Sequence, residues 1–173
     1  RLQGDWSSDV CSSDLVSLST PLMLAALGEL IAERAGVLNL SIEGMMLMGA
    51  SVGFAVAVTT ENIYLATLGG LLAGAVLSLV HAFVCITLKA NQIVSGLTLV
   101  MLGTGLAAFI GSDYAGAASP IQVEDLAIPG LSDIPFIGPI LFDQDLFVYV
   151  SIPLVMATTW FLFRTTWGQW LRA

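Results

Sequence analysis

The stretch IYLATLGGLLAGAVLSLVHAFVCITL, residues 63–88, decides the fold. It contains no Asp, Glu, Lys or Arg, and its apolar run exceeds the roughly 20 residues that an α-helix needs to cross the hydrocarbon core of a membrane. A run of this length also leaves room for some tilt. The stretch therefore predicts a transmembrane helix.

The composition of the whole chain agrees with this interpretation. Of 173 residues, 57% are hydrophobic and only 10% are charged, whereas a soluble domain carries about 25% charged residues. This excludes a water-soluble enzyme domain. The net charge of −8 is the opposite of what contact with nucleic-acid phosphates requires, so nucleic acid is excluded as a partner.

Further apolar runs on both sides of residues 63–88 predict an all-α fold, a polytopic bundle of about five transmembrane helices. Pro21 lies in the first turns of the first helix, where a missing N–H matters least. The expected helices span residues 15–34, 41–59, 63–88, 93–110 and 146–163.

The segments outside these helices define the expected domains. Residues 1–14, RLQGDWSSDVCSSD, lack a helical or strand period and resemble translated sequencing-adapter DNA, so we expect an extraneous segment, followed by a partial transmembrane domain at 15–173. Residues 111–145 hold four of the six prolines and no Lys or Arg, which predicts an external acidic loop, with a short helix or membrane-dipping piece around 134–142.

The few basic residues orient the bundle, because short cytoplasmic loops collect Lys and Arg. In the five-helix arrangement, Arg34, Lys89, Arg164 and Arg172 all fall on one side, while Glu61 and the acidic loop fall on the other. We therefore expect residues 34–40, 89–91 and 164–173 in the cytoplasm.

Small residues indicate that the helices pack against one another. Gly49 and Gly53, and Gly70 and Gly74, are two small-xxx-small pairs, a spacing that lets helix backbones approach closely in membranes.

The densest polar cluster near the membrane lies in residues 28–50, GELIAERAGVLNLSIEGMMLMGA. Two interpretations stay open. In the structural one, Glu29 contacts Glu33 or Arg34 along one helix end, Ser41 caps the second helix and Glu43 interacts with its dipole. In the functional one, these residues line a polar translocation path or gate, because intramembrane ionisable groups are costly unless they are paired or face a cavity, which makes them functional candidates.

Other polar residues have a similar double interpretation. His81, with Ser78 and Cys85 on one helix face, is interpreted as a helix contact, because no further ligand completes a zinc site. The residues Asn91, Gln92 and Ser95 either cap the fourth helix or donate hydrogen bonds at the mouth of a path. The candidate path or gate residues are thus Asn39, Ser41, Glu43, Asn91, Gln92 and Ser95.

Three strings carry a family resemblance: ERAGVLNLSIEGMMLMGA at 33–50, LKANQIVSGLTLVMLGTGLAAFIG at 88–111 and RTTWGQWLRA at 164–173. They resemble the inner-membrane permease subunits of ABC importers in the branched-chain amino acid and simple-sugar permease superfamily. The Asn-Leu-x-Ile-Glu-Gly core at 39–44 is most similar to the nucleoside-uptake branch. Two departures stand out: Ser41 replaces the usual Gly, and residues 98–104 lack an expected Asn.

The resemblance implies a permease subunit of an ATP-driven importer in the bacterial plasma membrane, with a nucleoside as substrate and a simple sugar as the next choice. The implied partners are an ABC ATPase, a second and related permease subunit, an external substrate-binding lipoprotein and membrane lipid. ATP and Mg²⁺ are expected on the ATPase, since this chain contains no GxxxxGK[ST] phosphate loop and no cofactor site. The residues that match the start of the ATPase-coupling segment are Thr166, Gly168, Leu171 and Arg172.

An alternative from composition and topology alone is a secondary transporter or channel that works without an ATPase. Broken helices in two inverted halves would support it, and these residues do not show two such halves. The only histidine, His81, has no catalytic partner, so the sequence does not favour an intramembrane enzyme.

Overall fold

The computed structural model describes residues 8–118, 126–127, 143–166 and 168. Its long helices are α1 (Ser8–Arg34), α2 (Ile42–Thr60), α3 (Ile63–Ala82), α4 (Gln92–Ser112) and α6 (Leu146–Arg164), and a π-helix, η1 (Phe83–Thr87), continues α3. Two short strands, β1 (Leu126–Ala127) and β2 (Asp143–Gln144), pair antiparallel. Among the described residues, 5 helices are long and apolar enough to cross a membrane, which confirms the helical-bundle prediction.

With η1 counted as the end of α3, the bounds of the later helices lie within two residues of those predicted, because the apolar runs end at polar turns. The start of α1 differs from the prediction. Its backbone is already helical at Ser8, where the sequence pattern gave no helix; Ser and Asp are only moderately poor helix formers and extend a helix that its apolar part nucleates. The short helix expected at 134–142 lies outside the described residues.

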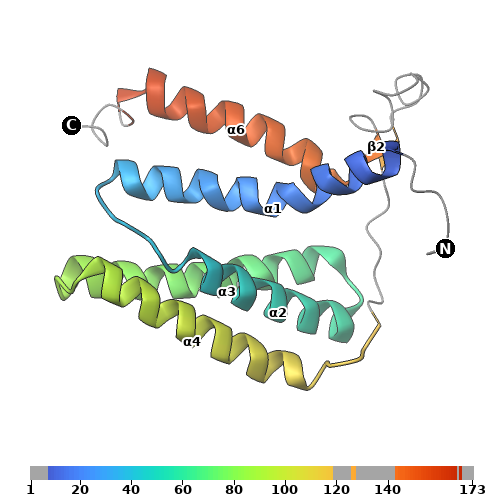
Figure 1. Ribbon diagram of the computed structural model, residues 1–173, viewed down its shortest axis with the longest axis horizontal. Helices are drawn as coiled ribbons and strands as arrows, with labels where there is room; N and C mark the ends of the chain where they lie inside the picture. The colour runs from blue at the N-terminus through green and yellow to red at the C-terminus, as the bar shows by residue number, and fades with distance from the viewer. Residues whose placement is uncertain (1–7, 119–125, 128–142, 167, 169–173) are drawn as a thin grey trace. The chain divides into compact units, whose positions relative to one another are not determined.

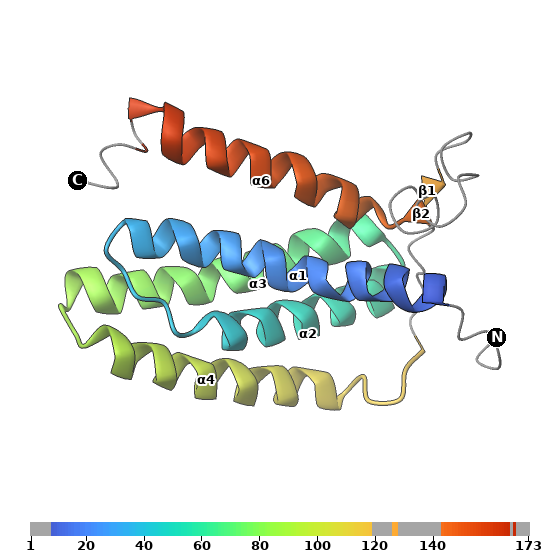
Figure 2. The ribbon, with the colours of Figure 1, turned by 45° about the horizontal axis from the view of Figure 1, so that its top comes forward.

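The chain forms two compact units, one of residues 1–28 and 123–173 and the other of residues 29–122. In the first unit, the Ser17 hydroxyl donates a hydrogen bond to Gln144 Oε1 over 3.0 Å. Gln144 is only 1% exposed. This contact places the first turns of α1 beside the residues that lead into α6 (Figure 2).

In the second unit, α2 packs against α3 through glycines (Figure 1). A Cβ added to Gly70 would lie 2.9 Å from the carbonyl oxygen of Gly49, and one added to Gly53 would lie 3.3 Å from that of Ala66. The close approach predicted from the small-residue pairs is therefore confirmed, although Gly74 lies at its margin, since a Cβ added there would lie 3.9 Å from the carbonyl oxygen of Met45.

A second close crossing joins α2 to α4. A Cβ on Gly44 would lie 2.8 Å from the carbonyl oxygen of Leu99, and one on Gly103 would lie 2.6 Å from that of Gly44. Glycine at both positions lets the two backbones touch directly, as in the small-residue interfaces of membrane helices.

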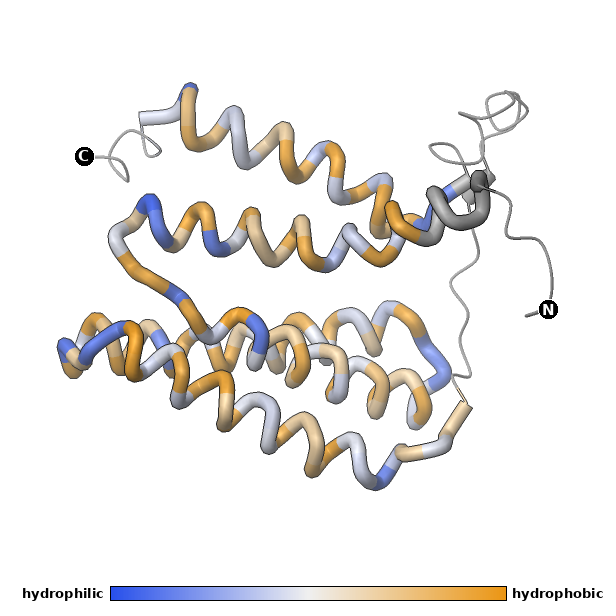
Figure 3. The backbone as a smooth tube through the Cα atoms, viewed as in Figure 1, coloured by the Kyte–Doolittle hydropathy of each residue, from blue (hydrophilic) through white to orange (hydrophobic). Residues whose placement is uncertain are grey.

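The turns of the second unit have well-defined caps. Asn62 Oδ1 accepts hydrogen bonds from the backbone N–H groups of Tyr64 and Leu65 at the start of α3. Lys89, in the turn between η1 and α4, has a φ of 52°, the left-handed conformation with which helices commonly end. Figure 3 shows both turns of this unit as hydrophilic, between helices that are mostly hydrophobic.

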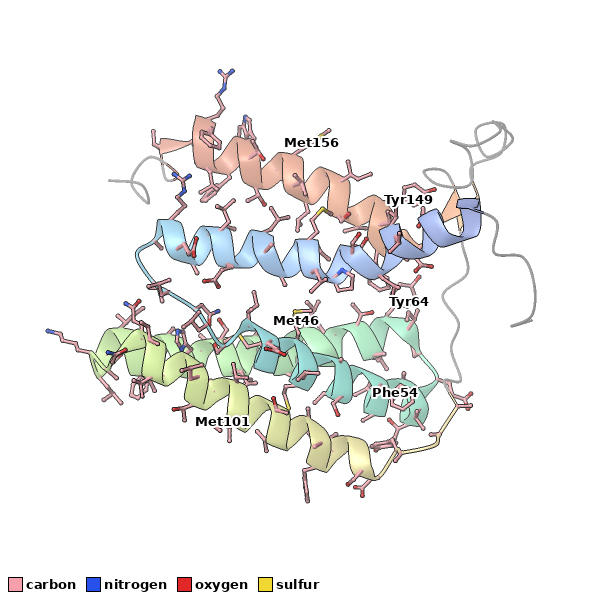
Figure 4. The ribbon with its side chains drawn as sticks, in the orientation of Figure 1. Met46, Phe54, Tyr64, Met101, Tyr149 and Met156 are labelled. Carbon is pink, nitrogen blue, oxygen red and sulfur yellow. The ribbon has the colours of Figure 1, made fainter. Side chains whose placement is uncertain are left out.

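The helices expose much of their apolar surface. Tyr64 is 79% exposed, Met101 78% and Met156 67% (Figure 4). Exposed apolar patches of this extent are untypical of a water-soluble monomer and suit helices that face lipid or further protein.

Candidate functional site

The polar cluster predicted from residues 28–50 surrounds the linker between α1 and α2, residues 35–41. The linker begins with a Schellman motif: the Gly36 N–H donates to Glu33 O and the Val37 N–H donates to Ala32 O, both over 3.0 Å. Gly36 has a φ of 80°, which glycine adopts without steric cost. The chain thus leaves α1 abruptly and enters a short extended segment.

Side chains from two other helices form hydrogen bonds with the backbone N–H and carbonyl oxygen of Leu38. Its N–H donates to Gln92 Oε1, on the first turn of α4, over 2.8 Å. Its carbonyl oxygen lies 3.3 Å from His81 Nε2, near the end of α3. The Leu38 side chain is 46% exposed, so the protein contacts this residue mainly through its backbone.

His81 lies at the centre of this arrangement and is only 3% exposed. A carbonyl oxygen can only accept, so the bond to Leu38 requires a proton on Nε2. In the neutral ring Nδ1 then accepts from the Ser95 hydroxyl, which lies 3.4 Å away. Cys85 Sγ lies 3.6 Å from Nε2. The predicted helix contact of His81 is confirmed, but the sequence gave no sign of its bond to the linker beyond a single polar ring in an apolar run.

Asn39 and Ser41 form the second half of the linker. The Asn39 N–H donates to Glu29 Oε1 over 3.1 Å. The Ser41 hydroxyl donates to Asn39 Oδ1, and Ser41 is fully buried. Within the described residues, the second oxygen of Glu29, Oε2, is buried without a hydrogen-bond partner.

Two structural predictions for this cluster were wrong. Ser41 stands at the N-cap of α2 but makes no capping hydrogen bond. Its φ of −89° and ψ of 4° lie outside the extended conformation in which a side-chain oxygen accepts from the first turn, and its hydroxyl points to Asn39 Oδ1. The predicted contact of Glu29 with Glu33 or Arg34 is replaced by the bond to the Asn39 N–H.

The other candidates have clear positions. Asn91 caps α4, since its Oδ1 accepts from the N–H groups of Ile93 and Val94. The capping prediction is confirmed for Asn91 but was wrong for Gln92 and Ser95, which bind Leu38 and His81. Glu43 lies in the first turn of α2, where a negative charge is favoured by the helix dipole, and its side chain is exposed. The structure thus gathers Asn39, Ser41, Gln92 and Ser95 around the linker and leaves Glu43 outside this network.

The candidate ATPase-coupling segment is described only in part. After α6, the Gly168 N–H donates to Thr165 Oγ1 over 3.1 Å. A Cβ on Gly168 would lie 2.7 Å from Leu162 Cα, so the chain folds back onto the last turn of α6. Thr166 is exposed. Leu171 and Arg172 lie outside the described residues.

The described residues contain no group of three or more His, Cys, Asp or Glu side chains that could hold a metal ion. The site consists instead of amide, hydroxyl, imidazole and carboxyl groups that bind backbone. It is therefore suited to holding a segment of chain in place.

Comparison with known proteins gives three relatives. A putative glucose ABC transporter permease protein, TsgC13 of Haloferax volcanii, is 42% identical over 156 residues, which cover 88% of this chain and 47% of that protein. The guanosine ABC transporter permease protein NupQ of Bacillus subtilis is 34% identical, over 90% of this chain and 52% of its own length. The nucleoside ABC transporter permease protein NupC of Lactococcus lactis is 31% identical, over 93% and 54%.

The chain therefore spans about half the length of the curated relatives that it matches. No solved structure matches it. The family model described as the permease component of the branched-chain amino acid transport system matches residues 12–173. Together with its five membrane-spanning helices, this match shows that the chain is a multi-pass membrane protein of the branched-chain amino acid transport permease family.

Proposed function

We propose that the protein containing this chain is the permease subunit of an ABC importer that carries a nucleoside, or failing that a simple sugar, across the plasma membrane. The family match over residues 12–173 carries the proposal. The names of the relatives support the substrate class, since two are nucleoside or guanosine permeases and one is a putative glucose permease. These solutes share hydroxyl-bearing sugar rings and no net charge.

The role in the importer follows from the same match. This subunit forms the membrane passage, a separate ATPase hydrolyses ATP with Mg²⁺, and an external binding protein delivers the solute to a pair of related permease subunits. The helices then alternate between two packings. Each partner shifts the populations of these two packings only through the difference between its affinities for them. Residues 164–173 begin the ATPase contact through Thr166, Gly168, Leu171 and Arg172.

The candidate path residues divide by their surroundings. Glu43 is exposed outside the linker network. The amide nitrogen of Asn39 has, among the described residues, only the Met45 sulfur as partner, at 3.9 Å. Both residues therefore have polar groups left for a solute. The side chains of Ser41, Asn91, Gln92 and Ser95 already bind within the protein. We therefore place Asn39 and Glu43 nearest the path and the other four behind it.

The proposal can be tested in proteoliposomes that contain the full-length permease with its ATPase, its second permease and its binding protein. Radiolabelled guanosine and glucose are offered separately. We expect ATP-dependent uptake of guanosine that needs the binding protein and stops when the ATPase carries a Lys→Ala change in its phosphate loop.

Two results would change the assignment. ATP-dependent uptake of glucose alone would move the substrate from nucleoside to sugar. Uptake that continues at the same rate without ATP or ATPase would contradict the importer and indicate a secondary transporter or channel.

A further inference from the structure

The backbone N–H and the backbone carbonyl oxygen of Leu38 are bound by side chains from two different helices. Gln92 Oε1 accepts from the N–H over 2.8 Å, and His81 Nε2 donates to the carbonyl oxygen over 3.3 Å. These side chains come from opposite sides of the turn between α3 and α4. The two contacts fix the linker relative to that turn.

A third contact presses the same part of the linker onto α4. A Cβ added to Gly96 would lie 2.9 Å from Leu40 Cβ and 3.2 Å from Leu40 N. Gln92 and Gly96 are four residues apart and so lie on one face of α4. Ser95, on the adjoining part of that face, orients His81 through Nδ1. The linker is thus held along the first turns of α4 by backbone contacts.

We infer that His81 and Gln92 are positioning residues for transport: they bind the Leu38 peptide so that the α1–α2 linker moves with the α3–α4 turn as one body. This inference rests on the proposed function. Residues 39–43, which follow Leu38 directly, contain both groups placed nearest the path. A displacement of Leu38 therefore moves Asn39 and the first turn of α2.

The chemistry of the two contacts selects the test variants. Gln92→Leu keeps the size of the side chain and removes the acceptor, whereas Gln92→Glu keeps an acceptor oxygen. His81→Phe keeps a buried ring without a donor, whereas His81→Gln restores an N–H group. Thr98→Val is the matched control on α4, because Thr98 is exposed and its hydroxyl bonds only to Val94 O on its own helix.

The first measurement is independent of transport. Hydrogen–deuterium exchange of the full-length permease in nanodiscs follows the peptide that contains Leu38. We expect exchange to rise at least about fivefold in Gln92→Leu, since one hydrogen bond contributes about 1 kcal/mol. Gln92→Glu and Thr98→Val retain the wild-type rate. Unchanged exchange in Gln92→Leu would overturn the contact itself.

The second measurement is uptake by the complete importer, normalised to folded permease. Gln92→Leu and His81→Phe lower the turnover number about fivefold without changing the KM for loaded binding protein, and the two conservative variants restore most of it. The double variant loses no more than the worse single variant, because both residues act through the backbone of one residue, Leu38.

A purely structural role would lower the amount of folded permease and leave the normalised turnover unchanged, which would overturn the inference. So would independent, additive losses in the double variant, or equal losses in Thr98→Val. If the wild-type complex takes up no solute while exchange responds to Gln92→Leu as expected, the proposed function fails and the contact stands.

Discussion

Gly103 of α4 touches the backbone of Gly44 of α2 so closely that a Cβ on Gly103 would lie 2.6 Å from the Gly44 carbonyl oxygen. The two residues form a crossing point where a methyl group has no room. The neighbouring Gly105, by contrast, has no atom within 4 Å of an added Cβ. This pair of glycines on one helix gives a direct test of the crossing.

We expect Gly103→Ala to lower the free energy of unfolding by about 1–3 kcal/mol, the usual cost of overpacking. Gly105→Ala should leave it unchanged or raise it slightly, since alanine favours helix. Denaturation of the full-length protein in detergent measures both. Equal stability of the two variants would rule out the close crossing of α2 and α4.

The end of α1 offers a second test through backbone conformation. Gly36 has a φ of 80°, so Gly36→Ala should cost about 1–2 kcal/mol, the penalty for a left-handed conformation with a Cβ. Gly28→Ala, inside α1 with no atom within 4 Å of an added Cβ, is the control and should not destabilise. The same unfolding measurement applies, and a neutral Gly36→Ala would mean that α1 ends differently.

Asn91 and Asn62 cap α4 and α3 in the same way. Replacing either by Ala should cost about 1 kcal/mol of stability, measured by denaturation. Because Asn62 lies at the other turn of the unit, Asn62→Ala serves as a cap-only control for uptake. We expect Asn91→Ala and Asn62→Ala to show equal uptake per folded permease, which assigns Asn91 to capping alone. Lower uptake by Asn91→Ala than by Asn62→Ala would give Asn91 a direct role in the path.

The orientation of the bundle can be tested at the two turns of the second unit. Single cysteines are placed at Lys89 and Glu61, both exposed, and labelled in intact cells with an impermeant maleimide. We expect the cysteine at position 61 to react and the one at 89 to react only after the membrane is permeabilised, because basic turns stay cytoplasmic. The reverse pattern would invert the topology.

Gly168 provides a test of the coupling segment. A Cβ there would lie 2.7 Å from Leu162 Cα, so Gly168→Ala should push the chain away from the last turn of α6. We expect normal membrane insertion but loss of co-purification with the ATPase, with Gly105→Ala as control. Full retention of the ATPase would show that the coupling contact lies elsewhere.

The sequence predicted the helices well because each is an apolar run bounded by charged or amide residues, and such boundaries depend only on local composition. The sequence also predicted that Gly49 and Gly70 lie at close helix contacts, because each belongs to a pair of glycines four residues apart in its own helix. It did not predict that these two residues face each other, because spacing along one helix does not say which neighbour it faces. Gly44 and Gly103 belong to no such pair and were missed.

The candidate site was predicted as a set of residues but not as an arrangement. Four of the six candidates do lie around the linker, yet His81 was treated apart from them as a helix contact, because a single imidazole in an apolar run has no zinc-binding or catalytic partner in the sequence. The wrong prediction for Ser41 has a local cause: its backbone is not in the extended conformation of a capping residue, and its hydroxyl donates to Asn39, two residues earlier. This conformation depends on the path of the chain between two helices.

The π-helix η1 has a consequence for how this chain can vary in length. The Leu88 N–H donates to Phe83 O over 3.2 Å, five residues back, so this turn encloses one residue more than an α-helical turn does. If one residue were removed from this turn, the backbone hydrogen bonds could continue in the regular α-helical pattern without a break. We therefore expect that a deletion of one residue within η1 leaves the backbone helical there, with the residues beyond it rotated about the helix axis.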